Sequence, residues 1–149
     1  MQTGDVAPDF ELPDSDGVPR RLSTMLAEGP VVLFFYPLAS SGGCTTEMCS
    51  VRDEAARFAA VGAQRVGISR DDVAAQKRFA EANGFDYPLL SDVDGAVCQA
   101  YGTRRNLAAA PVKRHTVVIG TDGVVKAVVK SEFRFAKHAD KALAALAPR

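Results

Sequence analysis

Six consecutive apolar residues, 31–36, limit the possible folds of this chain more than any other segment, and Pro37 ends the run. A strand with one buried face alternates apolar and polar residues, whereas a short run without polar residues is typical of a central strand covered on both faces. The run is also far too short to cross a membrane, because a spanning helix needs about 20 apolar residues. Helices are therefore expected on both faces of a central sheet.

Strand and helix patterns alternate on both sides of this run. The expected elements are a strand at 9–12 with a hairpin turn at 13–17, a helix after Gly43 with the apolar stripe Met48, Val51, Ala55 and Phe58, strands at 65–69 and 89–90, helices at 72–83 and 94–101, strands at 115–119 and 124–129, and a helix from Phe135 to Leu146. This order predicts an α/β sandwich with a mostly parallel centre and a terminal antiparallel hairpin. No repeat or linker divides the sequence, so residues 1–149 are expected to form a single domain.

The charge balance excludes one class of partner. Lys and Arg total 18 and Asp and Glu total 18, so the formal net charge is zero and no nucleic-acid partner is expected. No membrane partner is expected either, and residues 1–5 lack the basic start and apolar stretch of a signal peptide, which predicts a cytoplasmic protein. In that compartment the three cysteines are more often reactive or buried than joined in structural disulfides.

Cys44 has the surroundings of a reactive cysteine. It follows the buried strand and lies near the start of a predicted helix, where unpaired backbone N–H groups and the helix dipole favour a thiolate. Gly42 and Gly43 let the backbone approach a bound ligand. Ser41 offers a hydroxyl group, and Pro37 fixes the bend that leaves the strand. The alternative is that Cys44 is a small residue that fills a helix start.

Cys49 lies five residues further along the same predicted helix. On a regular helix this spacing places the two side chains about 140° apart around the axis, with a rise of about 7.5 Å. A disulfide requires Cα atoms about 4.4–6.8 Å apart, so the two cysteines cannot bond while the helix is intact. Cys49 is therefore either a core residue or one that reaches Cys44 after the first helical turns unwind.

Residues 35–53 resemble the peroxiredoxins, and most closely the bacterioferritin-comigratory (Q-type) subfamily. The peroxiredoxin pattern is a proline, three residues, a threonine or serine, two residues and the peroxidatic cysteine, which Pro37, Ser41 and Cys44 match. The Q-type addition is a resolving cysteine five residues later, matched by Cys49. The resemblance covers almost the whole chain, because it continues in residues 7–12, 86–92, 101–102 and 114–119.

The resemblance implies a thioredoxin-like fold, in which helices flank a central mixed β-sheet and an N-terminal hairpin is added. It implies a thiol peroxidase that reduces hydrogen peroxide and organic hydroperoxides in antioxidant defence. The Cys44 thiolate would attack the peroxide and become a sulfenic acid, Cys49 would condense with it to a disulfide, and thioredoxin or a similar dithiol would reduce that disulfide. A monomer or a weak homodimer is expected, as is common among Q-type relatives.

Ionisation of the thiol does not by itself produce a peroxidase. A free thiol is roughly 3% thiolate at pH 7, so complete ionisation gains only about thirty-fold, and positioning of the peroxide must supply the rest. Arg114 begins the segment that resembles the family's arginine-bearing strand, and it is the candidate for this role. Ser41 and the N–H group of Cys44 would add hydrogen bonds. Glu47 either orients Arg114 or is an exposed carboxylate in the first helical turn.

Two features depart from the family pattern. Thr-Pro-Gly more often precedes the peroxidatic cysteine, whereas this chain has Ser41, Gly42 and Gly43. The absence of the proline is expected to make local unfolding easier. Cys98 lies outside the motif and is expected to be a buried cysteine on a short helix. The other interpretation makes Cys98 an alternative resolving residue, which would put the role of Cys49 in doubt.

Other chemistry finds little support in the sequence. His115 and His138 are too few, and wrongly spaced, for a zinc site with these cysteines, so no metal is expected. No phosphate-binding loop or dinucleotide fingerprint is present, so no cofactor is expected. The alternative functions are a general thiol–disulfide oxidoreductase, against which the absence of a Cys-x-x-Cys motif argues, and a non-catalytic redox sensor or chaperone. The rate of reaction with peroxide distinguishes a peroxidase from a sensor.

Overall fold

A computed structural model describes residues 1–107, 110–132 and 135–146, without the side chains of residues 135 and 136. The strands are β1 (Glu11–Pro13), β2 (Pro19–Arg21), β3 (Val31–Phe35), β4 (Gln64–Ser69), β5 (Leu89–Ser91), β6 (His115–Ile119) and β7 (Val125–Lys130). The helices are α1 (Leu22–Leu26), α2 (Gly42–Asp53), α3 (Ala55–Ala60), α4 (Val73–Asn83), α5 (Ala96–Ala100) and α6 (Phe135–Leu146). The expected helix at the C-terminus is confirmed, and the expected apolar role of the Phe135 side chain lies outside the described residues.

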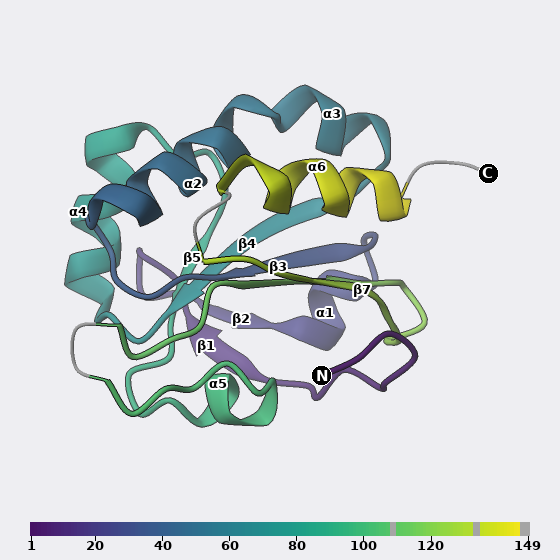
Figure 1. Ribbon diagram of the computed structural model, residues 1–149, viewed down its shortest axis with the longest axis horizontal. Coiled ribbons are helices and arrows are strands. Elements are labelled where there is room, and N and C mark those ends of the chain that lie inside the picture. The colour runs from purple at the N-terminus through teal and green to yellow at the C-terminus, as the bar shows by residue number, and fades with distance from the viewer. Residues whose placement is uncertain (108–109, 133–134, 147–149) are drawn as a thin grey trace.

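A five-stranded sheet with the order β5-β4-β3-β6-β7 forms the centre of the molecule (Figure 1). Strands β3, β4 and β5 are parallel, and β6 and β7 form the antiparallel hairpin that the sequence predicts. The short β1–β2 hairpin stands apart as a two-stranded sheet near the N-terminus. The register of β6 on β3 pairs His115 with Phe35, and it thereby brings Arg114 to the end of β3 from which α2 is reached.

The two faces of the sheet pack against different helices. Val32 and Phe34 of β3 contribute to a core that includes residues of α2, α3, α4 and α6. Val31, Leu33 and Phe35 point to the opposite face, where the core includes residues of α1 and α5. Figure 1 shows α2, α3 and α6 together on one side of the sheet, and α1, α5 and the β1–β2 hairpin on the other. The expectation of a β3 strand that is buried on both faces is therefore confirmed.

Three local features differ from the sequence-based expectation. The helix expected through Phe58 is divided at Glu54, whose φ of −93° and ψ of 15° separate α2 from α3. Asp53 and Glu54 place two carboxylates at the end of α2, where the helix dipole disfavours negative charge. Helix α1 was not expected, because its five residues are too few to show a period. The helix expected at 94–101 is shorter and begins at Ala96.

Residues 1–107, 110–132 and 135–146 contain neither a membrane-spanning helix nor a cluster of metal-ligating side chains. No helix there is both long enough and apolar enough to span a bilayer. Nor do the described residues bring together three or more His, Cys, Asp or Glu side chains in an arrangement that could hold a metal ion.

Candidate active site

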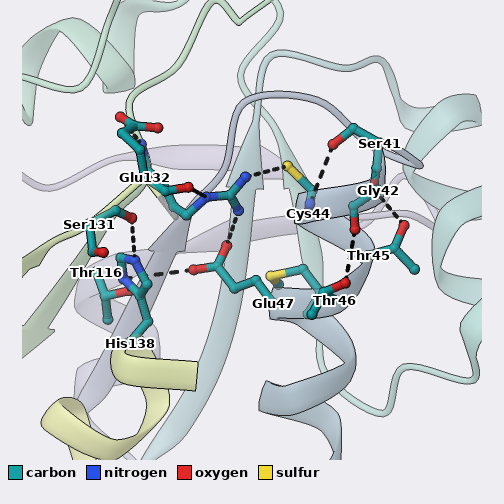
Figure 2. A network of polar contacts seen from close by, with 12 residues as sticks. Ser41, Gly42, Cys44, Thr45, Thr46, Glu47, Thr116, Ser131, Glu132 and His138 are labelled. Atoms are coloured by element: carbon teal, nitrogen blue, oxygen red, sulfur yellow. Dashed lines mark hydrogen bonds and ion pairs between the residues drawn. The ribbon is translucent and has the colours of Figure 1, made fainter. Parts of the chain in front are cut away.

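Cys44 is the third residue of α2 and has no exposed surface. Ser41 is the N-cap of this helix, and its hydroxyl oxygen accepts a hydrogen bond from the Cys44 backbone N–H group at 3.4 Å. The Ser41 carbonyl also accepts from the Thr45 hydroxyl group at 2.7 Å. The side chain and the carbonyl of one residue therefore organise the first turn of the helix, where a thiolate is favoured (Figure 2).

Arg114 contacts the sulfur of Cys44, and it reaches that position from the start of β6. Its Nη2 atom lies 3.3 Å from Cys44 Sγ, and its Nη1 atom donates to Glu47 Oε1 at 2.7 Å. The Arg114 Nε atom donates to the Glu132 carbonyl oxygen at 3.2 Å. Burial works against the charged guanidinium, but Glu47 and Cys44 outweigh it and raise the pKa of Arg114 above its ordinary value. A fixed positive charge therefore lies against the sulfur.

Glu47 is buried completely, one helical turn after Cys44. Of the two positions considered for this residue, the structure places it against Arg114 and excludes the exposed first-turn carboxylate. Burial raises the pKa of Glu47 to about 7, and the Arg114 charge opposes that rise. Only Oε1 is hydrogen-bonded, since Oε2 is buried without a hydrogen-bond partner among the described residues.

His138 belongs to the same network, and sequence reasoning missed it. This residue of α6 is fully buried, and its Nδ1 atom lies 3.7 Å from Glu47 Oε2. Nδ1 also lies 2.7 Å from the Thr116 hydroxyl oxygen, and Nε2 lies 2.7 Å from the Ser131 carbonyl oxygen. A polar residue beside Ala139 and Ala142, on the apolar stripe of α6, is the signal that would have pointed to it.

Pro37 lies where the chain leaves β3 and is buried, as the sequence-based account of the bend requires. The turn that follows is held by the Asp71 carboxylate, which accepts a hydrogen bond from the Ala39 N–H group at 2.8 Å. Ser40 adopts a positive φ of 64°, the only such value among the described residues other than glycine. This turn carries the chain from the end of the central strand β3 to Ser41 and Cys44.

Cys49 is half-buried and lies on α2 away from the Cys44–Arg114 contact. Its sulfur faces Asn83 Oδ1 of α4 at 3.7 Å, and both cysteines are free thiols. The α2 helix is continuous from Gly42 to Asp53, so the geometry that prevents a direct disulfide is present. A bond between Cys44 and Cys49 requires this helix to rearrange.

Cys98 is buried in the core on the opposite face of the sheet from Cys44. Burial, reinforced by the Asp92 carboxylate, raises the pKa of the Cys98 thiol above its ordinary range. The expectation of a buried cysteine on a short helix is confirmed, and the sheet separates Cys98 from the Cys44 network.

Comparisons with known proteins agree with this geometry. A family model described as the AhpC/TSA family matches residues 3–128. The crystal structure of peroxidoxin BcpB from Mycobacterium tuberculosis is 57% identical, with a TM-score of 0.94 over 98% of this chain and 96% of that one. A bacterioferritin comigratory protein structure from Xanthomonas campestris is 32% identical, with a TM-score of 0.83 over 92% and 89% of the two chains.

A chloroplastic peroxiredoxin Q from Arabidopsis thaliana is 39% identical over 143 residues, which are 96% of this chain and 66% of that protein. The match to solved peroxiredoxins confirms the thioredoxin-like fold expected from the sequence. Family model, sequence identity and fold agree, and they span the segment that brings Cys44, Glu47 and Arg114 together. The chain belongs to the AhpC/TSA family, as a peroxiredoxin of the Q-type, bacterioferritin-comigratory kind, and is thus a cysteine-based peroxidase.

Proposed function

We propose that this protein reduces hydrogen peroxide and organic hydroperoxides at Cys44, resolves the product as a Cys44–Cys49 disulfide and is recycled by thioredoxin or a similar dithiol. We further propose that it does so in the cytoplasm, as a monomer or a weak homodimer, in antioxidant defence. The single observation that carries the first step is the 3.3 Å contact between Arg114 Nη2 and Cys44 Sγ in a buried site.

In the first step the Cys44 thiolate attacks one peroxide oxygen, an S–O bond forms and the O–O bond breaks. The sulfur becomes a sulfenic acid, and the departing oxygen takes up a proton and leaves as water or an alcohol. Arg114 stabilises the thiolate and is close enough to donate hydrogen bonds to the peroxide oxygens beside it. Glu47 holds one side of the guanidinium and leaves Nη2 directed at the sulfur.

In the second step the Cys49 thiol attacks the Cys44 sulfenic acid, an S–S bond forms and water leaves. The contacts of α2 indicate which part of it moves. Hydrogen bonds to other segments hold its C-terminal half in place. The Tyr87 hydroxyl group donates to the Met48 carbonyl oxygen at 2.7 Å, and Arg52 donates to the Asn83 carbonyl oxygen at 2.6 Å. We therefore expect residues 42–47 to unwind while the rest of the helix stays in place.

The first turn of α2 is suited to such unwinding. Gly42 replaces the proline that is more common in the family, and glycine gains more backbone freedom on unfolding than any other residue. Gly42 is exposed, and the N-terminal Ser41 cap is a long hydrogen bond of 3.4 Å. After unwinding, the half-exposed Cys49 would carry the disulfide within reach of a dithiol reductant.

The test is oxidation of the reduced protein with one equivalent of hydrogen peroxide, followed by acid quenching at short times and tryptic digestion. Cys44 and Cys49 share the peptide 22–52, and Cys98 lies in the peptide 79–104. The proposal predicts rapid loss of two hydrogen atoms within the first peptide and its reversal by reduced thioredoxin. A cross-link between the two peptides would transfer the resolving role to Cys98. Oxidation no faster than that of a free thiol would contradict the proposed function.

A further inference from the structure

One buried polar atom of the site is left unexplained by the chemistry above. Glu47 Oε2 lies in the interior without a hydrogen-bond partner among the described residues, while Oε1 of the same carboxylate binds Arg114. An unsatisfied buried carboxylate oxygen is costly, since it has lost water and gained nothing in return. His138 lies on the side of this oxygen, with its Nδ1 atom 3.7 Å from Oε2 (Figure 2).

The hydrogen bonds of His138 fix how its ring is protonated. Nε2 faces the Ser131 carbonyl oxygen at 2.7 Å, and a carbonyl oxygen only accepts, so Nε2 carries a proton in every state. Nδ1, which faces both Glu47 Oε2 and the Thr116 hydroxyl group, is therefore the atom that gains or loses a proton. Nδ1 and Oε2 lie 3.7 Å apart, an ion-pair distance that is longer than a hydrogen bond, so one proton on this pair of groups gives the unsatisfied oxygen an electrostatic partner.

Counting charges in the network leads to the same conclusion. With Cys44 as a thiolate, the buried groups Cys44, Glu47 and Arg114 carry two negative charges and one positive charge. One additional proton on the pair formed by Glu47 and His138 makes the buried network neutral, which its low-dielectric surroundings favour. The titratable and charged groups that surround the pair are Cys44, Tyr87, Arg114, His115, Glu132 and Lys137.

We propose that His138 is a positioning residue of the peroxidase site: it shares one proton with Glu47 Oε2 and thereby holds Glu47, and through it Arg114, against Cys44. The inference rests on the proposed function of Cys44 and extends the site from α2 and β6 to α6. Because no part of His138 contacts the sulfur in the described interactions, the proposed route from His138 to Cys44 runs through Glu47 and Arg114.

A double-mutant cycle on the rate of Cys44 oxidation tests this route. The chain has no tryptophan to report the reaction by fluorescence, so the second-order rate constant is measured by acid quenching and mass spectrometry in a Cys49→Ser background. His138→Leu is expected to lower the rate constant roughly tenfold when Glu47 is present. In a Glu47→Gln background the same substitution is expected to change the rate constant less than about twofold, because the route through Glu47 is already broken.

Two conservative variants separate positioning from simple packing. His138→Asn keeps a polar group near the position of Nδ1, and His138→Gln keeps one near the position of Nε2. The proposal predicts that Asn restores most of the rate and that Gln resembles Leu. If His138 only anchors α6 through its hydrogen bond to Ser131, the Gln variant would keep most of the rate and the Asn variant would resemble Leu. That result would overturn the proposal. Leu143→Ala, on the same buried face of α6, is the control for loosened packing, and it should lower thermal stability without the rate loss of His138→Leu.

Each result bears on one claim only. A wild-type protein whose Cys44 reacts no faster than a free thiol contradicts the proposed function itself. A fast wild-type protein in which the two substitutions lower the rate independently contradicts the positioning role and leaves the peroxidase intact.

Discussion

Cys44 and Cys98 occupy almost the same local position in two parts of the fold. Each is the third residue of a helix that follows a strand of the sheet, and neither has any exposed surface. In both cases a side chain just before the helix accepts a hydrogen bond from the cysteine N–H group. The local backbone position therefore does not distinguish a reactive cysteine from an inert one.

The two cysteines differ in the charge that lies beside them. The acceptor for Cys44 is the neutral Ser41 hydroxyl group, and the Arg114 guanidinium lies 3.3 Å from its sulfur. The acceptor for Cys98 is the Asp92 carboxylate, which accepts at 2.8 Å and, together with burial, raises the pKa of the thiol. At Cys44 the guanidinium contacts the sulfur directly, whereas at Cys98 the opposing effect of the Arg70 charge is outweighed by burial and Asp92.

The largest expected effect separates the cysteines as resolving partners. Cys49→Ser should abolish the intramolecular disulfide, because Cys98 is buried on the other face of the sheet from Cys44. Cys98→Ser should leave that disulfide unchanged. Mass spectrometry of the two peroxide-treated variants under non-reducing conditions shows whether each one contains the intramolecular disulfide. A Cys44–Cys98 disulfide in the Cys49→Ser variant would contradict the claim that the sheet keeps these two cysteines apart.

Removing the cation should make Cys44 behave more like Cys98. Arg114→Met should slow the oxidation of Cys44 by peroxide on the order of a thousandfold, because the variant loses the charge and the donors at the sulfur. The rate of sulfenic acid formation measures this effect. Arg20→Met is the matched control, since it breaks an arginine pair with the buried Asp14 carboxylate elsewhere. If Arg114→Met lowers the rate of Cys44 oxidation less than tenfold, Arg114 does not take part in the reaction with peroxide.

Glu47, the buried carboxylate beside Arg114, should make the free energy of unfolding depend on pH. The pKa of Glu47 is raised from 4.5 to about 7, so the folded protein keeps a proton that the unfolded chain has released in this range. The contribution of Glu47 to the free energy of unfolding is therefore highest below the lower value and falls as pH rises through the window. Relative to Glu47→Gln, the wild-type protein should lose on the order of 1–3 kcal/mol across it, as measured by urea unfolding. Parallel pH profiles for the two proteins would contradict this account.

The smallest expected effect concerns the first turn of α2. Ser41 has φ −72° and ψ 154°, the extended conformation that a following proline favours, and a Cβ atom at Gly42 would meet nothing within 4 Å. Gly42→Pro should thus stabilise the reduced protein by about 0.4–1 kcal/mol and slow disulfide formation, with the first oxidation little changed. Thermal unfolding and quenched time courses test both parts. Faster disulfide formation in the variant would contradict the unwinding of residues 42–47.

Local sequence signals were enough to predict Cys44, Ser41 and Pro37 as one turn at the start of a helix. The resemblance to peroxiredoxins added Arg114, which lies 70 residues from Cys44 along the chain. The register of β6 on β3 explains why these two residues meet, and no single segment encodes that register. The division of α2 from α3 was missed because the apolar stripe continues through both helices.

His138 shows where sequence reasoning stops. Its role depends on how α6 packs beside α2 on one face of the sheet, because the contact between His138 and the Glu47 oxygen forms only when both helices are in place. Considered in the sequence, His138 could be weighed only as a metal ligand, and its spacing from the cysteines gave no site. The network around Cys44 is thus built from α2, β6 and α6, and only the first two carry a recognisable pattern.

The most direct test of the central claim is a comparison of Cys44 and Cys98 within one sample. Reduced protein would be mixed with less than one equivalent of hydrogen peroxide, quenched at increasing times and digested, and the oxidation of peptides 22–52 and 79–104 would be followed separately. The account predicts that Cys44 is oxidised orders of magnitude faster than Cys98, and that this difference largely disappears in Arg114→Met. Similar rates at the two cysteines in the wild-type protein would contradict the claim that the neighbouring charge makes Cys44 reactive.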